Sequence, residues 1–177
     1  MDFYGVVEKR KSIRKYKSDP VEKEKLERIF QAARYAPSWK NLQCWRFMAI
    51  DDKETIAKVK ANCDEWNQKI ISDEVPLVVI LFAVEADSGV RDGKDYYMLD
   101  AGLAMEHLML AAANEGLGTC WMGLFDEEGI KQELGVPAGV RVIAISPLGY
   151  PNQDPAPRPR KELTEIVFGN EWGKPLF

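Results

Sequence analysis

The sequence predicts a single domain, residues 1–177, that combines α-helices with β-strands. Its 177 residues, 46% of them hydrophobic, are the usual size and composition of one globular domain. Short runs of valine and isoleucine are typical of strands, whereas other segments repeat apolar residues with the helical spacing of three and four. These patterns alternate along the chain without an internal repeat, so we expect one mixed α and β fold.

The composition excludes several classes of function. The chain has 24 basic and 28 acidic residues, a net charge of −4 that disfavours bulk attraction to nucleic acid or to an anionic membrane. No apolar run reaches the roughly 18 residues of a membrane span, and the N-terminal residues lack a secretory signal. One histidine and three scattered cysteines predict reduced thiols, a cytoplasmic protein and no metal site. If the protein is an enzyme, an organic cofactor supplies its chemistry.

The strands are predicted from short β-branched runs. Residues 76–84 form an apolar run rich in valine and isoleucine, which is typical of a buried strand. Residues 85–94 are polar with two glycines and predict a loop. The patterns together predict helices over 2–10, 19–36, 51–71, 95–115 and 126–134, and strands over 46–50, 76–84, 118–122 and 141–148.

Most helices are predicted from their ends. The first has basic residues in its last turn, where they suit the negative end of the helix dipole. The next two open on an acidic N-cap followed three residues later by glutamate: Asp19 with Glu22, and Asp51 with Glu54. Pro37 ends the second helix.

Two segments are too apolar for an isolated chain. The helix over 95–115 has apolar residues on nearly all sides, which predicts a central helix that a second subunit also covers. The tail over 162–177 carries several aliphatic and aromatic residues, so we expect it to dock on this subunit or on a neighbour.

Two cationic islands interrupt this acidic protein. Residues 9–17 hold six cations and no acid, and residues 158–161 hold three more. They indicate either a local anion site or a solvated helix end with a flexible tail.

Four segments, in order and spacing, resemble the nitroreductase family of flavin enzymes. They are residues 10–14 (RKSIR), 36–47 (APSWKNLQCWRF), 116–123 (GLGTCWMG) and 157–161 (PRPRK). The resemblance covers nearly the whole chain. It implies an α+β fold with a mixed sheet of four to five strands flanked by helices, in an intertwined homodimer. It also implies two FMN molecules at the interface and a C-terminal extension that reaches over the partner.

The resemblance assigns one group of residues to the phosphate, ribityl and pyrimidine parts of FMN: Arg10, Lys11, Ser12, Arg14, Arg158 and Arg160. Arg10, Arg158 and Arg160 match the cations that hold the phosphate, as expected for charge-assisted bonds to a doubly charged group. Ser12 matches a hydroxyl that contacts the ribityl chain or the ring edge. Arg14 matches a cation near the pyrimidine edge, where it would favour the anionic reduced flavin.

A second group matches positions that line the isoalloxazine ring. Pro37, Ser38, Trp39 and Asn41 would come from the partner subunit, whereas Trp121, Met122 and Gly123 would lie beside N5, with the Gly123 N–H aimed at that atom. The family more often has a small residue where Trp39 stands. Trp39 either stacks near the flavin and narrows the pocket or packs at the dimer seam. Asn67 or Lys69 would contact the pyrimidine edge.

The resemblance implies an NAD(P)H-dependent oxidoreductase with a ping-pong hydride transfer. NADH or NADPH reduces the flavin, and a nitroaromatic, a quinone or a similar flat small molecule is reduced in turn. One alternative is a flavoenzyme of the same family with a different reaction, dehalogenation or dehydrogenation. A second is a nucleic-acid-binding module that uses residues 9–17, against which the net negative charge weighs.

Overall fold

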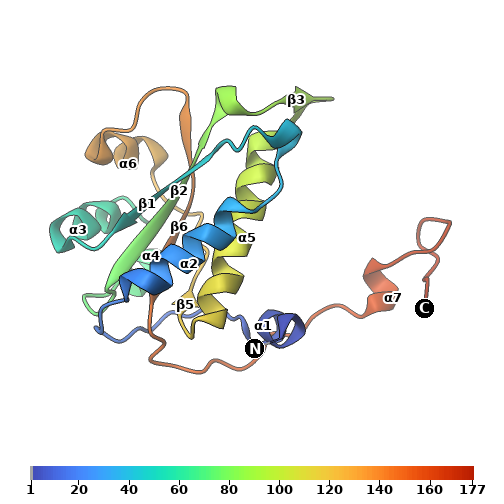
Figure 1. Ribbon diagram of the computed structural model, residues 1–177, viewed down its shortest axis with the longest axis horizontal. Helices are drawn as coiled ribbons and strands as arrows, with labels where there is room; N and C mark the ends of the chain where they lie inside the picture. Colours follow the sequence, from blue (N-terminus) through green and yellow to red (C-terminus); the bar gives the residue numbers. More distant parts are fainter. Residues whose placement is uncertain (1) are drawn as a thin grey trace.

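The computed structural model describes residues 2–177, which fold around one antiparallel sheet (Figure 1). The order of its strands is β1-β2-β6-β5, and each neighbouring pair is antiparallel. The strands are β1 (Trp45–Ile50), β2 (Leu77–Val84), β5 (Gly118–Thr119) and β6 (Val140–Gly149). The predicted α+β class and all four predicted strands are confirmed, although β5 is shorter than expected and continues only as a bridge between Met122 and Ile145.

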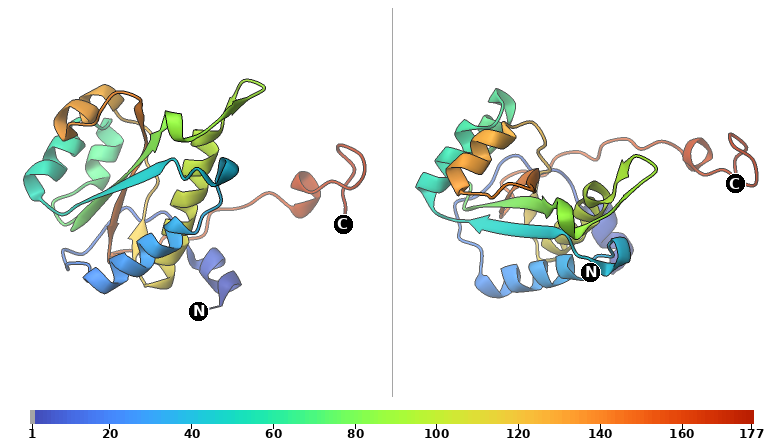
Figure 2. Two further views of the ribbon diagram at one scale, coloured as in Figure 1. Left: turned by 45° about the horizontal axis from the view of Figure 1, so that its top comes forward. Right: turned by 90° about the horizontal axis from the view of Figure 1, so that it is seen from above.

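Helices cover both faces of the sheet. They are α1 (Phe3–Lys9), α2 (Lys23–Arg34), α3 (Lys53–Ala61), α4 (Glu65–Ile70), α5 (Tyr96–Asn114), α6 (Glu127–Leu134) and α7 (Leu163–Ile166), with the 3-10 turns η1 (Trp39–Asn41) and η2 (Glu85–Asp87). Helix α2 lies on one side of the sheet and α3 and α6 lie on the other (Figure 2).

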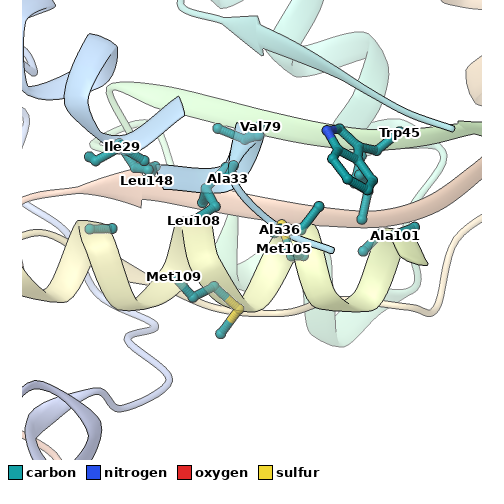
Figure 3. Close-up of a cluster of buried hydrophobic side chains, with 14 of the residues drawn as sticks. Ile29, Ala33, Ala36, Trp45, Val79, Ala101, Met105, Leu108, Met109 and Leu148 are labelled. Carbon is teal, nitrogen blue, oxygen red and sulfur yellow. The ribbon is translucent and has the colours of Figure 1, made fainter. Parts of the chain in front are cut away.

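The layers follow from the alternation of side chains along β2. Val79 and Leu81 face a core shared with α2 and α5 (Figure 3), whereas Val78 and Ile80 face a core shared with α3, α4 and α6. Because both faces of β2 are buried, the strand needs apolar residues at every position. This explains the uninterrupted apolar run of the sequence.

The predicted start of the second helix is wrong. The helix begins at Lys23, because the Glu22 carbonyl accepts the first helical hydrogen bond, from the Leu26 N–H at 3.1 Å. Asp19 lies outside the helix. The Glu22 carboxylate does not cap it and instead accepts a hydrogen bond from the Tyr150 hydroxyl at 2.6 Å.

The helical stretch predicted over 51–71 consists of two helices, α3 and α4. Asp52, not Asp51, caps the first helix, and its carboxylate accepts a hydrogen bond from the Thr55 N–H at 2.7 Å. Asp64 caps the second helix. The sequence pattern thus located the start of α3 within one residue.

Residues 85–94 are more ordered than the predicted loop. They contain η2 and most of a hairpin formed by β3 (Val90–Arg91) and β4 (Lys94–Asp95). Asp92 and Gly93 join its strands with φ angles of 52° and 73°. A two-residue turn with both φ angles positive is the type that Asp-Gly favours in hairpins.

The two segments predicted to be too apolar for one chain remain partly uncovered. Helix α5 buries one side against the sheet and α2, but Met98, Leu99 and Leu103 are exposed. The tail extends away from the body (Figures 1 and 2), and Trp172 is 94% exposed. The tail therefore does not dock on its own subunit. Within residues 2–177, no helix combines the length and apolarity needed to cross a membrane.

Candidate functional site

Residues 10–14 lie along β5 at the edge of the sheet. Ser12 forms a parallel bridge with Thr119, and the Ile13 N–H donates to the Thr119 carbonyl at 2.8 Å. This close approach needs a glycine at position 118, because a Cβ there would lie 2.6 Å from Ile13 Cγ1. The backbone of the segment is thus fixed before any ligand binds.

The chain that follows β6 returns to this segment. The Asn152 N–H donates to the Lys15 carbonyl at 2.9 Å, and the Lys11 ammonium contacts the Asp154 carboxylate at 2.9 Å. These contacts bring two ends of the chain together around a cleft of about 480 Å³. Its lining includes six predicted site residues: Arg10, Lys11, Ser12, Arg14, Arg158 and Arg160.

The cleft is strongly cationic. Five of its lining residues are basic, and Glu8 is the only acidic one. Lys11 is paired with Asp154, and this hydrogen bond holds the pKa of the Asp154 carboxyl below its usual range. Among residues 2–177, no carboxylate lies within 4.0 Å of the four cleft arginines. Such uncompensated arginines fit a phosphate ligand.

The loop over 121–123 follows β5. Met122 is 2% exposed and exchanges backbone hydrogen bonds with Ile145, so its side chain belongs to the core rather than to a ligand site. Gly123 is exposed, and Trp121 is 40% exposed. Of these three residues, Gly123 and Trp121 are therefore accessible to a ligand.

Asn67, which the sequence offered as a flavin contact, supports this loop. It is 6% exposed, and its side-chain amide donates to the Leu124 carbonyl at 3.1 Å. The alternative, Lys69, is exposed and lines a different surface depression with Lys60 and Asp73.

The segment that holds Pro37, Ser38, Trp39 and Asn41 lies at the other end of α5. The Trp39 N–H donates to Asp100 on this helix at 3.0 Å, whereas Arg10 lies in a depression that includes Ala113. Asp100 and Ala113 are 13 residues apart on α5, which corresponds to about 20 Å. Within one subunit, the structure therefore does not bring the 37–41 segment together with the cationic cleft.

The cysteines are not poised as nucleophiles. Burial raises the pKa of the Cys44 and Cys63 thiols to about 11 and also raises that of Cys120. All three are buried, so they remain protonated and shielded near neutral pH. Among residues 2–177, no cluster of three histidine, cysteine or acidic residues has metal-binding geometry.

Sequence reasoning missed two acidic residues at these sites. Asp154 neutralises Lys11, and Asp100 anchors the backbone of Trp39. Asp100 was detectable, because it is an acid inside an otherwise apolar helix and is 2% exposed. Asp154 carried no such signal, since it lies in a polar, proline-rich stretch.

Comparison with known proteins gives consistent matches over nearly the whole chain. A nitroreductase family protein from Clostridium novyi is 33% identical, with a TM-score of 0.82 over 99% of this chain and 97% of that chain. An FMN-dependent nitroreductase from Clostridium difficile is 31% identical, with a TM-score of 0.83 over 96% of this chain and 99% of that chain. An NADH dehydrogenase of Thermus thermophilus is 28% identical over 90% of this chain and 92% of that protein.

Other relatives carry the names of other reactions. An iodotyrosine deiodinase of Thermotoga neapolitana is 26% identical over 90% of this chain and 94% of that protein.

The sequence model described as the nitroreductase family matches residues 7–77 and 71–150. The chain is therefore an oxidoreductase that belongs to the nitroreductase family.

Proposed function

We propose that the protein is an FMN-dependent oxidoreductase that uses NADH or NADPH to reduce nitroaromatics, quinones or similar flat acceptors in a ping-pong reaction. Relatives named FMN-dependent nitroreductase and NADH dehydrogenase support both the cofactor and the reductant. The proposed partners are a second copy of the chain and a small-molecule oxidant, and they do not include nucleic acid.

The cationic cleft is the observation that carries this proposal. Arg10 and Arg158 are 148 positions apart in the sequence, yet they line one cleft together with Ser12. A phosphomonoester with about −1.5 to −2 charges matches a cleft rich in uncompensated arginines. We assign Arg10, Arg158 and Arg160 to the phosphate, and Ser12 to the adjoining ribityl hydroxyls.

The chain's own residues would bind and orient rather than exchange protons. FMN, when bound, supplies hydride transfer from NAD(P)H to an acceptor, and a proton from solvent completes the two-electron reduction of a quinone to its hydroquinone. Arg14 would place a positive charge beside the pyrimidine edge. The exposed Gly123 would offer its N–H as a donor to N5, with Trp121 beside it. Asn67 would hold this loop in place through the Leu124 carbonyl.

The geometry of α5 supports a homodimer with the site at its interface. The ring-lining segment and the cationic cleft lie at opposite ends of this helix, about 20 Å apart. If two copies pack their exposed α5 faces in antiparallel fashion, the 37–41 segment of one subunit approaches the cleft of the other. Met98, Leu99 and Leu103 supply the apolar contact surface, and the extended tail of each subunit would cover its partner.

A second candidate function is reductive dehalogenation with the same cofactor. The similarity to a protein named iodotyrosine deiodinase supports it. The two functions are distinguished by offering the reduced enzyme either an iodinated phenol or a nitroaromatic under anaerobic conditions and measuring which of the two reoxidises it.

The proposal is tested on the purified protein with added FMN. We expect a flavin spectrum that NADH or NADPH bleaches without oxygen, and a colourless protein that takes up no FMN would refute the proposal. Arg10→Ala should weaken FMN binding by about 1.5–3 kcal/mol, roughly 10- to 150-fold in Kd. Lys15→Ala is the matched control, because Lys15 belongs to the same basic run but does not line the cleft. Equal FMN affinity in the two variants would remove Arg10 from the site.

A further inference from the structure

Asp100 on α5 holds three separate segments of the chain together next to the 37–41 segment. The residue is 2% exposed, and its carboxylate accepts hydrogen bonds from the Trp39 N–H at 3.0 Å and the Ser88 hydroxyl at 3.2 Å. The Cys44 thiol, kept protonated by its raised pKa, lies 3.9 Å from the same carboxylate. Among residues 2–177, no cation lies within 4.0 Å of Asp100. A buried carboxylate held by neutral donors fixes these segments relative to α5.

The Trp39 side chain packs against Gly89 and Tyr96, the residues on either side of the β3–β4 hairpin. Its ring lies 4.2 Å from the Tyr96 ring, centroid to centroid. A Cβ at Gly89 would lie 2.6 Å from the Trp39 Nε1 atom, so the indole occupies the space that this glycine leaves open. The Tyr96 N–H also donates to the Gly89 carbonyl at 2.9 Å. The β3–β4 hairpin and Trp39 therefore form one packed unit.

The backbone after Trp39 is held in an unfavourable conformation. Lys40, Asn41 and Gln43 have φ angles of 48°, 59° and 55°. The Gln43 N–H donates to the Ser38 hydroxyl at 3.0 Å, which helps to fix this path. Non-glycine residues in the left-handed region persist where the surroundings enforce them, and they cluster at ligand sites.

We propose that Trp39 is the specificity-determining residue of the acceptor pocket and that Gly89 is the residue that positions it. This inference rests on the proposed function, because the 37–41 segment lines the ring only if FMN binds between two subunits. Trp39 is half-buried, and its indole is fixed by Tyr96, Gly89 and the backbone anchor on Asp100. Such a wall cannot swing aside for a wide acceptor. The pocket should therefore prefer flat, single-ring oxidants and disfavour oxidants with several fused rings.

The test compares a one-ring quinone, 1,4-benzoquinone, with a three-ring quinone, anthraquinone-2-sulfonate. Selectivity is the kcat/KM of the wide quinone divided by that of the narrow one, measured on FMN-loaded dimer with NADH. Trp39→Ala should raise this selectivity about tenfold, the scale of discrimination that a pocket wall provides. Gly89→Ala should raise it in the same direction, because the new methyl group displaces the indole.

The double variant identifies the mechanism. If Gly89 acts only through Trp39, adding Gly89→Ala to Trp39→Ala changes selectivity no further. A selectivity equal to wild type in Trp39→Ala, or an undiminished effect of Gly89→Ala in the double variant, would overturn the inference. Bound FMN is measured in every variant. A wild-type protein that does not bind FMN would refute the proposed function. A Trp39→Ala variant that binds FMN fully but has unchanged selectivity would refute only the role of Trp39.

Discussion

Gly118→Ala should displace the segment over residues 10–14, which carries the proposed FMN contacts, without removing any of its side chains. The Cβ of this alanine would lie 2.6 Å from Ile13 Cγ1 and 2.7 Å from Ile13 Cβ, whereas ordinary contact begins at 3.4 Å. Because Ile13 Cβ is bonded to the backbone, a rotamer change cannot relieve the clash. The segment that carries Arg10, Ser12 and Arg14 must move by about 0.8 Å.

Two effects follow from this shift, one on stability and one on FMN binding. Overpacking of this kind destabilises a fold by about 1–3 kcal/mol. Ser12 and Arg14, which flank Ile13, move with it, so several of the proposed contacts to FMN would weaken together. Losing the equivalent of one charge-assisted hydrogen bond would cost about 1.5–3 kcal/mol, roughly 10- to 150-fold in the Kd for FMN.

Gly149→Ala is the matched control. Gly149 pairs with Gly118 in the β5–β6 register, and a Cβ there would lie 2.7 Å from the Pro76 ring and 3.5 Å from Tyr16 Cδ1, with no Ile13 atom among its three nearest neighbours. FMN affinity is measured by fluorescence titration, and the free energy of unfolding of each apo-variant by urea. We expect similar destabilisation in both variants but weaker FMN binding only in Gly118→Ala. Wild-type affinity in Gly118→Ala, or equal losses in both variants, would refute this account of how the sheet positions the site.

Two further predictions concern pH and assembly. Arg141 holds the pKa of the Glu127 carboxyl below its usual 4.5. This ion pair therefore stabilises the fold above about pH 4.5, and its contribution is lost as the pH falls through the lowered pKa. Glu127→Gln should therefore lower the free energy of unfolding by about 1–2 kcal/mol at pH 7, and a difference that persists undiminished in urea unfolding near pH 3 would contradict this. Deleting residues 162–177 should weaken the proposed dimer by about 3 kcal/mol if two of the exposed tail side chains are buried in it. Unchanged association in sedimentation velocity would contradict the proposed packing of the tail on the partner.

The errors in the predicted fold have local and distant causes. The cap at Asp19 satisfied every local rule, but Tyr150, more than 100 residues away, engages Glu22 and the helix starts later. No local pattern contains that contact. The hairpin after β2 is different, because the Asp92-Gly93 pair is a recognised turn signal within the sequence. Its strands were missed because each has only two residues.

Part of the candidate site could likewise be predicted from the sequence and part could not. The motif that contains Arg10 and Ser12 and the distant pair Arg158 and Arg160 were identified by resemblance, and the fold brings them into one cleft. The environment of Trp39 could not be predicted. It depends on a missing Cβ at Gly89 and on the Asp100 anchor, and a single sequence does not show which elements these residues pack against.

Helix α5 explains why this site would depend on assembly. The helix is long enough to separate the 37–41 segment from the cationic cleft, and its outer face exposes Met98, Leu99 and Leu103. A two-fold axis across this face would complete two equivalent sites at once, each from one cleft and one partner segment. In the proposed dimer, FMN would then contact both subunits and bind more tightly to the dimer than to the monomer. By linkage, FMN must strengthen dimerisation by the same factor. The exposed apolar surface of the single chain and the two incomplete half-sites are thus consequences of the same arrangement.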